Sequence, residues 1–391
     1  MSVARVEGNA HGRLRAILDA LQTPGALPSL WTLRAWEAEQ GISLRFERLG
    51  AMLEIDLERL DPARPAYAAT RAFNVYYSVF GRARPDLEPH ERDLVDVVVA
   101  TVRAHERALP LFADAPPETL ATDGAREKRV ALREVTAERA LIAEAPGMYY
   151  LNPYTGCILG CTYCYGIGRT SFVRDLDELP RAPWGRWIDV KVNAPELVAR
   201  EVRTLAPGTV RMSPLVTDPY QPVERRYRIT RRCLEALRES DFTPVVLTRS
   251  PVVTDDIALF RTMPRLLIGM SVPTDDDAVR AVFEPNAPPI ADRVAALAAL
   301  RAAGLRTFAV AHPMLPMDPA RLVELLSPLV EVVRVGPMAE KPFIAHAYQR
   351  AGRLECSTEA WERATFDALR EGFARRGVPV NPTFEPWGTF R

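Results

Sequence analysis

The chain has 391 residues, of which 48% are hydrophobic, so it is long enough for two packed domains or for one barrel with additions. Its 50 Lys and Arg residues balance 50 Asp and Glu residues, and this zero net charge argues against a chain-wide attraction for nucleic acid, although a local basic patch stays open. The sequence shows no apolar segment of membrane-spanning length and no signal-peptide core. With only five cysteines, we expect a cytoplasmic protein without a membrane partner.

The first part of the chain, residues 1–128, favours an N-terminal α+β accessory domain whose role the sequence does not indicate. Apolar residues at helical spacing predict helices over 11–21, 30–40, 66–79 and 89–109. Alternating apolar residues over 42–46 and 53–57, separated by Leu49 and Gly50, predict a β-hairpin. The turn-rich residues 115–124 suit a linker.

Residues 129–345 alternate between apolar runs and amphipathic helical runs. Strands are predicted over 148–152, 209–216, 244–248, 266–272, 307–313 and 332–337, with helices over 196–205, 230–239, 255–262, 290–303 and 319–326. Six β–α steps predict an α/β fold in which a parallel sheet curls into a partial (β/α)6 TIM-type barrel. Such barrels place their sites at the carboxyl ends of the strands. Residues 346–391 are predicted to be a C-terminal extension with a helix over 359–376.

Three of the five cysteines follow the first predicted strand of this barrel. Cys157, Cys161 and Cys164 have the spacing C-x3-C-x2-C, and three thiolates can bind three irons of a [4Fe–4S] cluster while the fourth iron lacks a protein ligand. Structural zinc would need a fourth ligand, which no nearby histidine or cysteine supplies, and unliganded thiols are the other alternative. The two remaining cysteines are too few for an auxiliary cluster, so we expect one cluster only.

Polar residues stand at the ends of the next strands. Thr217, Asp218, Arg249 and Ser271 supply the cation, the acceptor and the hydroxyls that would bind an amino-acid ligand carrying a ribose. Three of these residues have a plain structural alternative: Asp218 capping a turn, Arg249 as a surface cation, and Ser271 as a small residue in a tight place.

The cysteine spacing with an aromatic residue before the third cysteine resembles the radical S-adenosylmethionine (radical SAM) superfamily. The string NPYTGC-x2-GC-x-YCY, followed by TDPYQPVE, TRS, FEPNAPP and HPMLP, resembles its spore photoproduct lyase-like branch over roughly residues 130–320. The resemblance implies a [4Fe–4S] cluster on the three cysteines and S-adenosyl-L-methionine chelating the unique iron. It also implies that Tyr163 neighbours the adenine, that Arg249 lies near the methionine carboxylate, and that Ser271 lies near the cofactor.

The activity implied by this resemblance is reductive cleavage of S-adenosylmethionine to a 5′-deoxyadenosyl radical, which abstracts hydrogen from an unidentified substrate. A low-potential electron donor of the flavodoxin or ferredoxin type is the expected partner. Tyr165 is the candidate catalytic residue, for radical transfer, with packing as its alternative. No cysteine lies between Cys164 and Cys233, so the hydrogen-donating cysteine of spore photoproduct lyase has no counterpart.

Two other functions stay open on the sequence alone. One is a nucleic-acid lesion repair lyase, suggested by the resemblance and by the arginine-rich residues 224–232, which could equally be a solvated surface. The other is a non-catalytic iron–sulfur module for electron transfer or redox sensing.

Overall fold

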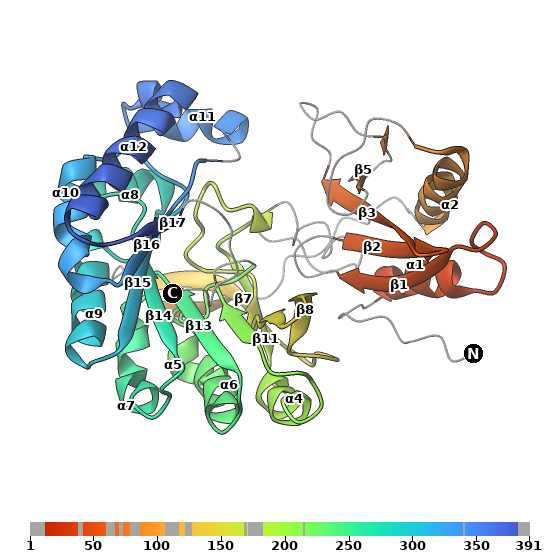
Figure 1. Ribbon diagram of the computed structural model, residues 1–391, viewed down its shortest axis with the longest axis horizontal. Helices are drawn as coiled ribbons and strands as arrows, with labels where there is room; N and C mark the ends of the chain where they lie inside the picture. The colour runs from red at the N-terminus through yellow and green to blue at the C-terminus, as the bar shows by residue number, and fades with distance from the viewer. Residues whose placement is uncertain are drawn as a thin grey trace. The chain divides into compact units, whose positions relative to one another are not determined.

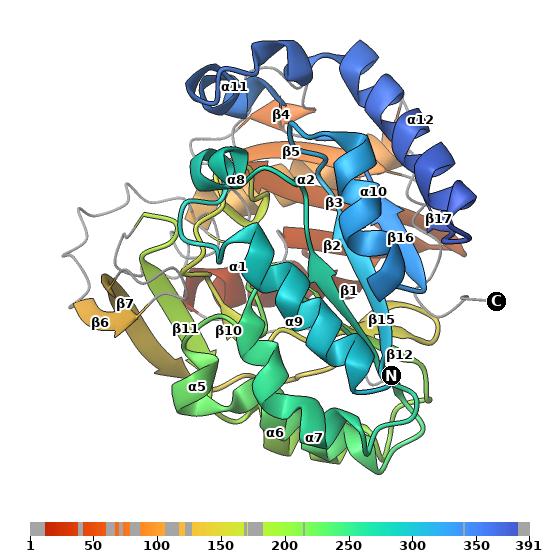
Figure 2. The same cartoon turned by 90° about the vertical axis from the view of Figure 1, so that its left-hand side faces the viewer.

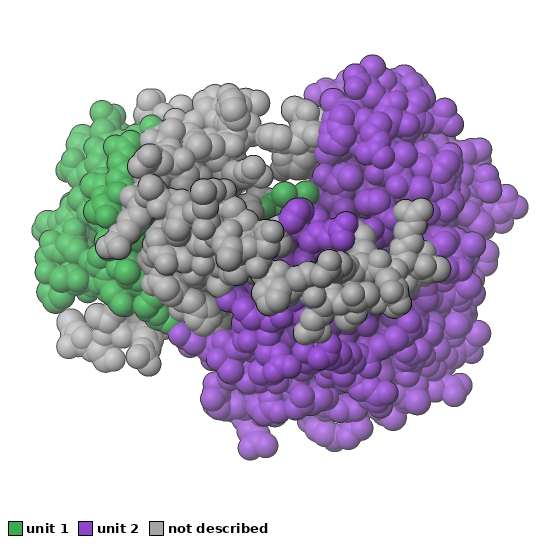
Figure 3. Space-filling view, turned by 180° about the vertical axis from the view of Figure 1, so that it is seen from behind, with its two compact units in different colours: residues 1–116, 165–182 green, residues 117–164, 183–391 purple. Residues whose placement is uncertain are grey.

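The computed structural model of the chain describes residues 12–37, 42–59, 67–69, 73–78, 87–105, 117–121, 127–167, 170, 183–213, 216–338 and 341–381. The chain divides into two compact units (Figure 3). The first comprises residues 1–116 and 165–182, and the second comprises residues 117–164 and 183–391. No helix among the described residues is long and apolar enough to cross a bilayer.

The described residues of the first unit include a five-stranded antiparallel sheet and the helices α1 and α2 (Figure 1). The sheet has the order β1-β2-β3-β5-β4, with β1 (Thr32–Glu37), β2 (Ile42–Arg48), β3 (Ala51–Arg59), β4 (Ala68–Ala69) and β5 (Phe73–Ser78). The helices are α1 (Gly12–Gln22) and α2 (Pro89–His105). Alternate residues of β2 and β3, among them Leu44 and Ile55, are fully buried with Val98 of α2, which closes the core of this unit. The predicted hairpin and these two helices are therefore confirmed.

Two predicted helices of this unit are wrong, because residues 30–40 contain β1 and residues 66–79 contain β4 and β5. In β1 the register shifts between Leu33 and Ala35, so Leu33 and Trp36 are both buried although they stand three residues apart. This bulge imitates the i, i+3 spacing of a helix. In β5 the run Phe73–Ser78 is rich in aromatic and β-branched residues, which favour a strand.

The second unit has a mixed α/β architecture, and its main element is a large, mostly parallel sheet. Its order is β17-β16-β15-β14-β13-β12-β9-β8, so each strand lies beside the preceding strand of the same sheet. The six predicted strands are present as β9 (Met148–Tyr150), β12 (Thr209–Met212), β13 (Thr243–Thr248), β14 (Leu267–Ser271), β15 (Arg306–Ala311) and β16 (Val332–Val335). β17 (Val380–Asn381) pairs parallel to β16, and β8 (Ile142–Ala145) pairs antiparallel to β9.

A second sheet, smaller and four-stranded, is formed by residues that come before and between the first strands of the large sheet in the sequence. It has the order β10-β11-β7-β6, from β6 (Pro117–Ala121), β7 (Glu127–Val135), β10 (Tyr154–Thr155) and β11 (Trp187–Lys191). The connections of the large sheet contain α4 (Ala194–Glu201), α5 (Glu224–Tyr227), α6 (Ile229–Arg238), α7 (Ile257–Phe260), α8 (Asp277–Phe283), α9 (Ile290–Ala302) and α10 (Pro319–Leu326). After β16 come α11 (Lys341–Arg350) and α12 (Glu359–Arg375), and α12 confirms the predicted C-terminal helix.

Local sequence explains where these helices begin. Asp318 precedes α10, its carboxylate accepts from the backbone N–H groups of Ala320 and Arg321, and Pro319 occupies the first helical turn. Asp276 caps α8 in the same way through the N–H of Ala278. α9 follows Pro289 and is closed by Gly304, whose φ of +80° suits a helix end.

The helices cover one face of the large sheet, as Figure 2 shows for α6, α9 and α10. The other face carries its own small apolar cluster, formed by Val245, Leu247, Leu267, Phe308, Val310 and Val332. Ser271 pairs in register with Val310, so it shares this second face. Arg249 follows Leu247 by two residues and continues the same face past the end of β13. Two of the predicted site residues therefore lie at the carboxyl ends of neighbouring strands.

Candidate functional site

The cysteine loop, residues 156–164, begins directly after β10 and turns on two glycines. Gly156 has φ +84° and Gly160 has φ +58°, a left-handed conformation that glycine adopts without steric cost. A Cβ on Gly156 would lie 2.5 Å from the carbonyl oxygen of Trp187, and a Cβ on Gly160 would lie 2.9 Å from Nδ2 of Asn286. Both positions therefore require glycine, for the backbone conformation and for the close packing against the loop.

The three thiols of this loop lie close together. Cys157 and Cys161 are buried and Cys164 is half-buried. Burial, followed by the carboxylate of Asp218 and the thiols of Cys161 and Cys164, raises the pKa of Cys157 well above its usual range. Burial also raises the pKa of Cys161 to about 12, although Arg249 acts to lower it. Both thiols are thus protonated at neutral pH in the metal-free chain, and metal binding releases their protons.

The donor set suits a cluster better than a single metal ion. Among the described residues, which include all three cysteines, no group of three Cys, His, Asp or Glu side chains is placed to hold one ion. Two thiolates on one zinc lie about 4 Å apart, since each Zn–S bond is about 2.3 Å. In a cubane each cysteine binds a different iron, which holds the sulfurs farther apart. Three thiols on one loop are the number of ligands that leaves one iron of a [4Fe–4S] cluster without a protein ligand.

The backbone around Cys157 is held by Thr217 and Gln221, which follow β12. Gln221 Nε2 donates to the carbonyl oxygen of Gly156 (3.1 Å), and Gln221 Oε1 accepts from the N–H of Ile158 (2.9 Å). The hydroxyl of Thr217 donates to the same carbonyl oxygen (2.8 Å). Thr217, predicted to bind cofactor, is thus engaged with the cysteine loop in the metal-free structure, and Gln221 brackets the first cysteine on both sides.

Asp218 is fully buried and joins the ends of β12 and β13. Its carboxylate accepts from the hydroxyl of Thr248 (2.5 Å), from the N–H of Arg249 (2.9 Å) and from the N–H of Tyr220 (3.0 Å). Burial raises its pKa, while these donors and the Arg249 side chain act to lower it. The contact with Tyr220 is the turn cap that the sequence offered as an alternative for this residue.

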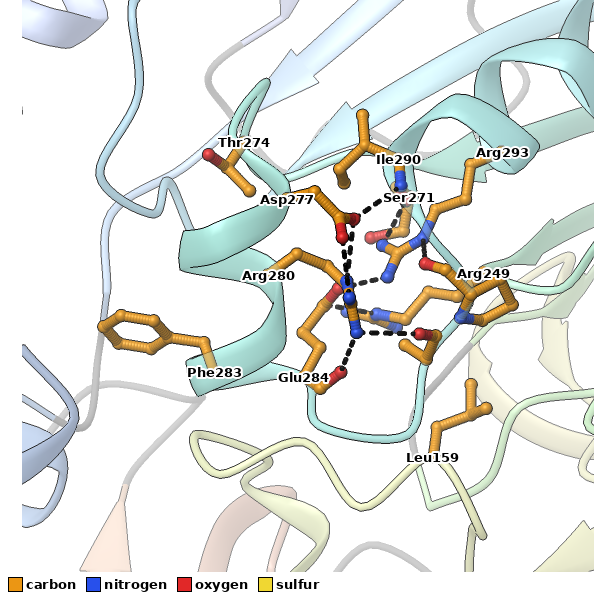
Figure 4. A network of polar contacts seen from close by, with 12 residues as sticks. Leu159, Arg249, Ser271, Thr274, Asp277, Arg280, Phe283, Glu284, Ile290 and Arg293 are labelled. Carbon is orange, nitrogen blue, oxygen red and sulfur yellow. Dashed lines mark hydrogen bonds and ion pairs between the residues drawn. The ribbon is translucent and has the colours of Figure 1, made fainter. Parts of the chain in front are cut away.

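Arg249 lies at the centre of a buried ion-pair network, which Figure 4 shows from close by. Its Nε donates to Glu284 (2.8 Å) and one of its terminal nitrogens donates to the hydroxyl of Tyr163 (3.1 Å). The Tyr163 hydroxyl in turn donates to the same oxygen of Glu284. Arg249 is only 8% exposed, which excludes the alternative that it is a surface cation.

The carboxylate of Glu284 is held by a second arginine. Arg293 and Glu284 are both fully buried, and their side chains pair at 2.5 Å. Burial alone would raise the pKa of Glu284, but Arg293 and Arg249 outweigh it and lower the pKa to about 2. Glu284 is therefore ionised at neutral pH, and its carboxylate links two arginines with the tyrosine of the cysteine loop.

Ser271 joins this network through its backbone only. Arg293 donates from Nη1 to the carbonyl oxygen of Ser271 (3.0 Å), and its Nε donates to the carbonyl oxygen of Pro288 (3.0 Å). The hydroxyl of Ser271 is buried and has no hydrogen-bond partner in the described part of the chain. A buried hydroxyl of this kind is costly unless a partner is supplied. It fits a ligand that brings its own polar groups, such as the sugar of S-adenosylmethionine.

The structure thus brings Tyr163, Arg249 and Ser271 into one network, while Thr217 and Asp218 hold the backbone beside it. Tyr165 follows the last cysteine, is 37% exposed and is grouped with the first unit, so its predicted catalytic role stays a prediction.

Sequence reasoning missed three residues of this site: Gln221, Glu284 and Arg293. Two of them lie in strings that the sequence had singled out, TDPYQPVE and FEPNAPP, but no role could be read from the strings. Arg293 stands on the buried face of α9 with Ile290, Leu297 and Leu300, and an arginine at such an apolar position was a signal that sequence reasoning did not use.

Residues 151–327 match the radical SAM superfamily. An uncharacterized protein of Methanocaldococcus jannaschii is 28% identical over 169 residues, which cover 43% of this chain and 61% of that protein. An uncharacterized protein of Mycobacterium tuberculosis is 28% identical over 202 residues, covering 48% of this chain and 57% of that protein. The chain thus spans about three fifths of the length of the curated relatives that it matches.

Solved structures with some likeness include a mutant of spore photoproduct lyase, with a TM-score of 0.49 and 16% identity over 64% of this chain and 82% of the other. Another is SuiB of Streptococcus suis bound to S-adenosylmethionine, with a TM-score of 0.41 and 13% identity over 62% of this chain and 51% of the other. Scores and identities this low carry no argument about the activity of this chain.

Proposed function

Because residues 151–327 of this chain match the radical SAM superfamily, we propose that the chain is a radical SAM enzyme acting on an unidentified substrate. The superfamily implies a [4Fe–4S] cluster that cleaves S-adenosylmethionine. The observation that carries the proposal is the placement of two buried thiols and one half-buried thiol on one loop beside Arg249, together with the hydroxyl of Ser271, which has no hydrogen-bond partner among the described residues. The proposed scaffold is the partial (β/α)6 barrel, for which the sequential parallel strands β9 and β12–β16 provide support.

Cys157, Cys161 and Cys164 would hold the cluster, which would supply the electron for reductive cleavage of S-adenosylmethionine and so for hydrogen abstraction from the substrate. The protein residues bind and orient the cofactor. An arginine has five N–H donors, and Glu284 and Tyr163 engage two of those of Arg249, which leaves three for the methionine carboxylate. Ser271 offers its hydroxyl to the ribose, and Tyr163 offers its ring to the adenine.

The electron has to come from outside the chain, so the proposed partner is a low-potential donor of the flavodoxin or ferredoxin type. A reducing cytoplasm is the proposed location, since a half-buried cluster cysteine leaves the site open to oxidants. Both the electron donor and the location are inferred from the proposed cluster chemistry.

The test is anaerobic reconstitution with iron and sulfide, followed by dithionite and S-adenosylmethionine. We expect 5′-deoxyadenosine and methionine, and deuterium transfer into deoxyadenosine from a labelled candidate would identify the substrate. A fully loaded cluster that yields no deoxyadenosine would overturn the proposal and favour a non-catalytic iron–sulfur module.

Nucleic-acid lesion repair gains no support from the arginine-rich residues 224–232. Arg231 pairs with Asp256 (2.5 Å) and Glu235 (3.0 Å), Arg232 pairs with Glu196 (2.5 Å), and Arg225 lies 3.6 Å from Asp255. These carboxylates neutralise much of the local charge that phosphate binding would need. We therefore do not propose a nucleic-acid substrate.

A further inference from the structure

The cysteine loop is gripped by a short segment that lies far along the chain, Phe283–Asn286, here called the 283–286 segment. The amide Nδ2 of Asn286 donates to the carbonyl oxygens of Ile158 (3.2 Å) and Leu159 (3.1 Å). The carbonyl oxygen of Phe283 accepts from the backbone N–H (2.9 Å) and from the hydroxyl (3.1 Å) of Thr162. These contacts join residues that are 121 to 128 positions apart.

The contacted residues are the spacers between the cysteines. Ile158 and Leu159 stand between Cys157 and Cys161, and Thr162 stands between Cys161 and Cys164. The conformation of these spacers sets the distances between the three sulfurs. One segment therefore fixes both intervals of the C-x3-C-x2-C pattern, while Gln221 holds the opposite side of the loop at Ile158.

Glu284 adds a third contact from the same segment. It accepts from the hydroxyl of Tyr163, which lies in the second spacer, and it pairs with Arg249 (2.8 Å) and Arg293 (2.5 Å). Through Arg293 the same carboxylate is linked to the backbone of Ser271. Glu284 thus joins the cysteine loop to the side chain of Arg249 and, through Arg293, to the backbone of Ser271.

Contacts within the protein hold this segment in place. Arg280 donates from Nη1 to the carbonyl oxygens of Glu284 (3.4 Å) and Ala287 (3.2 Å), and its guanidinium pairs with Asp277 (2.8 Å) (Figure 4). Asp277 also accepts from the N–H of Ile290, at the start of α9 (3.1 Å). The connection between α8 and α9 is therefore a braced turn, and its contacts with the loop are made by protein groups alone.

We propose that Phe283, Glu284 and Asn286 are positioning residues that hold the cysteine loop in its cluster-binding shape before iron arrives, and that Glu284 couples this shape to the position of Arg249. The inference rests on the proposed function for the identity of the bound group, but it does not depend on catalysis. A loop that is already shaped loses less conformational entropy when it binds, so the bound state is favoured.

The first test is Asn286→Ala, which removes two hydrogen bonds to the spacer and leaves the three cysteines in place. The reconstituted protein is kept anaerobic, and iron release to a chelator is followed by absorbance. We expect release about tenfold faster than in the wild type, equivalent to about 1.4 kcal/mol of lost cluster stabilisation.

Asn193→Ala is the matched control. Asn193 is half-buried like Asn286, and its amide makes two backbone bonds of 2.8 Å, both with Ala137, away from the cysteine loop. We expect both variants to lower the melting temperature of the metal-free protein to a similar extent, whereas only Asn286→Ala accelerates iron release.

The second test, Tyr163→Phe, keeps the ring and the Asn286 contacts but removes the hydroxyl shared by Glu284 and Arg249. We expect iron release near the wild-type rate, and a Kd for S-adenosylmethionine raised about fivefold in a titration of the reduced cluster followed by electron paramagnetic resonance. Asn193→Ala should leave this Kd unchanged.

Each outcome decides the inference. Iron release at the wild-type rate from Asn286→Ala, or equal acceleration in both asparagine variants, would overturn the positioning role. An unchanged Kd in Tyr163→Phe would overturn the coupling through Glu284. If the loaded wild type forms no deoxyadenosine but the iron-release difference persists, the proposed catalysis fails while the positioning role stands. A wild type that takes up no cluster overturns both.

Discussion

Replacing Glu284 by glutamine tests how strongly the buried network is held together by charge. The side chain keeps its size, but Arg249 and Arg293 lose the carboxylate that pairs with both of them. Both arginines are at least nine-tenths buried, so water cannot take the place of the missing charge. We expect Glu284→Gln to be one of the more destabilising single changes in the second unit.

The magnitude follows from the pKa of Glu284, which is lowered from its ordinary value of 4.5 to about 2. This difference corresponds to about 3 kcal/mol of folding free energy, at about 1.4 kcal/mol for each pH unit. Breaking a buried ion pair by removing one partner costs about 3 to 5 kcal/mol in other proteins, which agrees in size.

The pH dependence has a defined sign. Because the folded pKa lies below the unfolded one, the stabilisation is complete above about pH 4.5 and is lost as the pH falls towards 2. The difference in stability between the wild type and Glu284→Gln should therefore be constant from pH 8 to pH 5 and shrink below that.

The assay is urea unfolding of the metal-free protein at 25 °C, followed by circular dichroism over this pH range. Glu201→Gln is the control, because burial raises the pKa of Glu201 and its ionised form gains no such stabilisation at neutral pH. A loss below about 1 kcal/mol for Glu284→Gln at pH 7, or a difference that grows as the pH falls, would refute the reasoning.

Three further changes test the site. Cys157→Ser should abolish cluster loading, whereas Cys233→Ser, at a buried position on α6, should retain it. The loaded protein should hold at most about four irons per chain, because a second cluster has no ligands. A higher iron count would contradict this. Gln221→Ala leaves the buried N–H of Ile158 without its acceptor and removes one donor to the carbonyl oxygen of Gly156. Urea unfolding should therefore show a free energy of unfolding lowered by about 2 to 4 kcal/mol, and iron should be released faster. A variant as stable as the wild type would contradict this. Gly156→Ala forces a Cβ to within 2.5 Å of the Trp187 carbonyl oxygen at φ +84°, so we expect poor folding or no bound iron, and a normally loaded variant would show that the loop can shift.

The sequence predicted well those elements that are defined by local pattern. The apolar runs of β13 to β16 and the amphipathic spacing of α9 gave the right element types in the right order. The errors lie where tertiary structure alters the pattern. The bulge in β1 placed Leu33 and Trp36 on one face at a helical interval, and no local rule distinguishes that from a helix.

The candidate site divides in the same way. The cysteines could be found because their ligand role depends on residue type and spacing, both of which the sequence shows. The partners of Asp218 could not be found, since a buried carboxylate serves a ligand or the backbone according to which donors the fold brings to it. The ion pair of Glu284 with Arg293 depends on the path of the α8–α9 connection, which no spacing rule specifies.

The distance along the chain between the cysteines and the residues that grip them has a consequence for biogenesis. A nascent chain that has emerged only as far as β14 already carries all three thiols, but it lacks every bond from Phe283 to Asn286 and the arginine of α9. If the proposed positioning role holds, the cysteine loop is not yet fixed in its cluster-binding shape when iron is delivered at that stage. We therefore expect the cluster to be inserted after α9 has been synthesised. Fragments that end before α9 should bind iron poorly, although they contain all three cysteines.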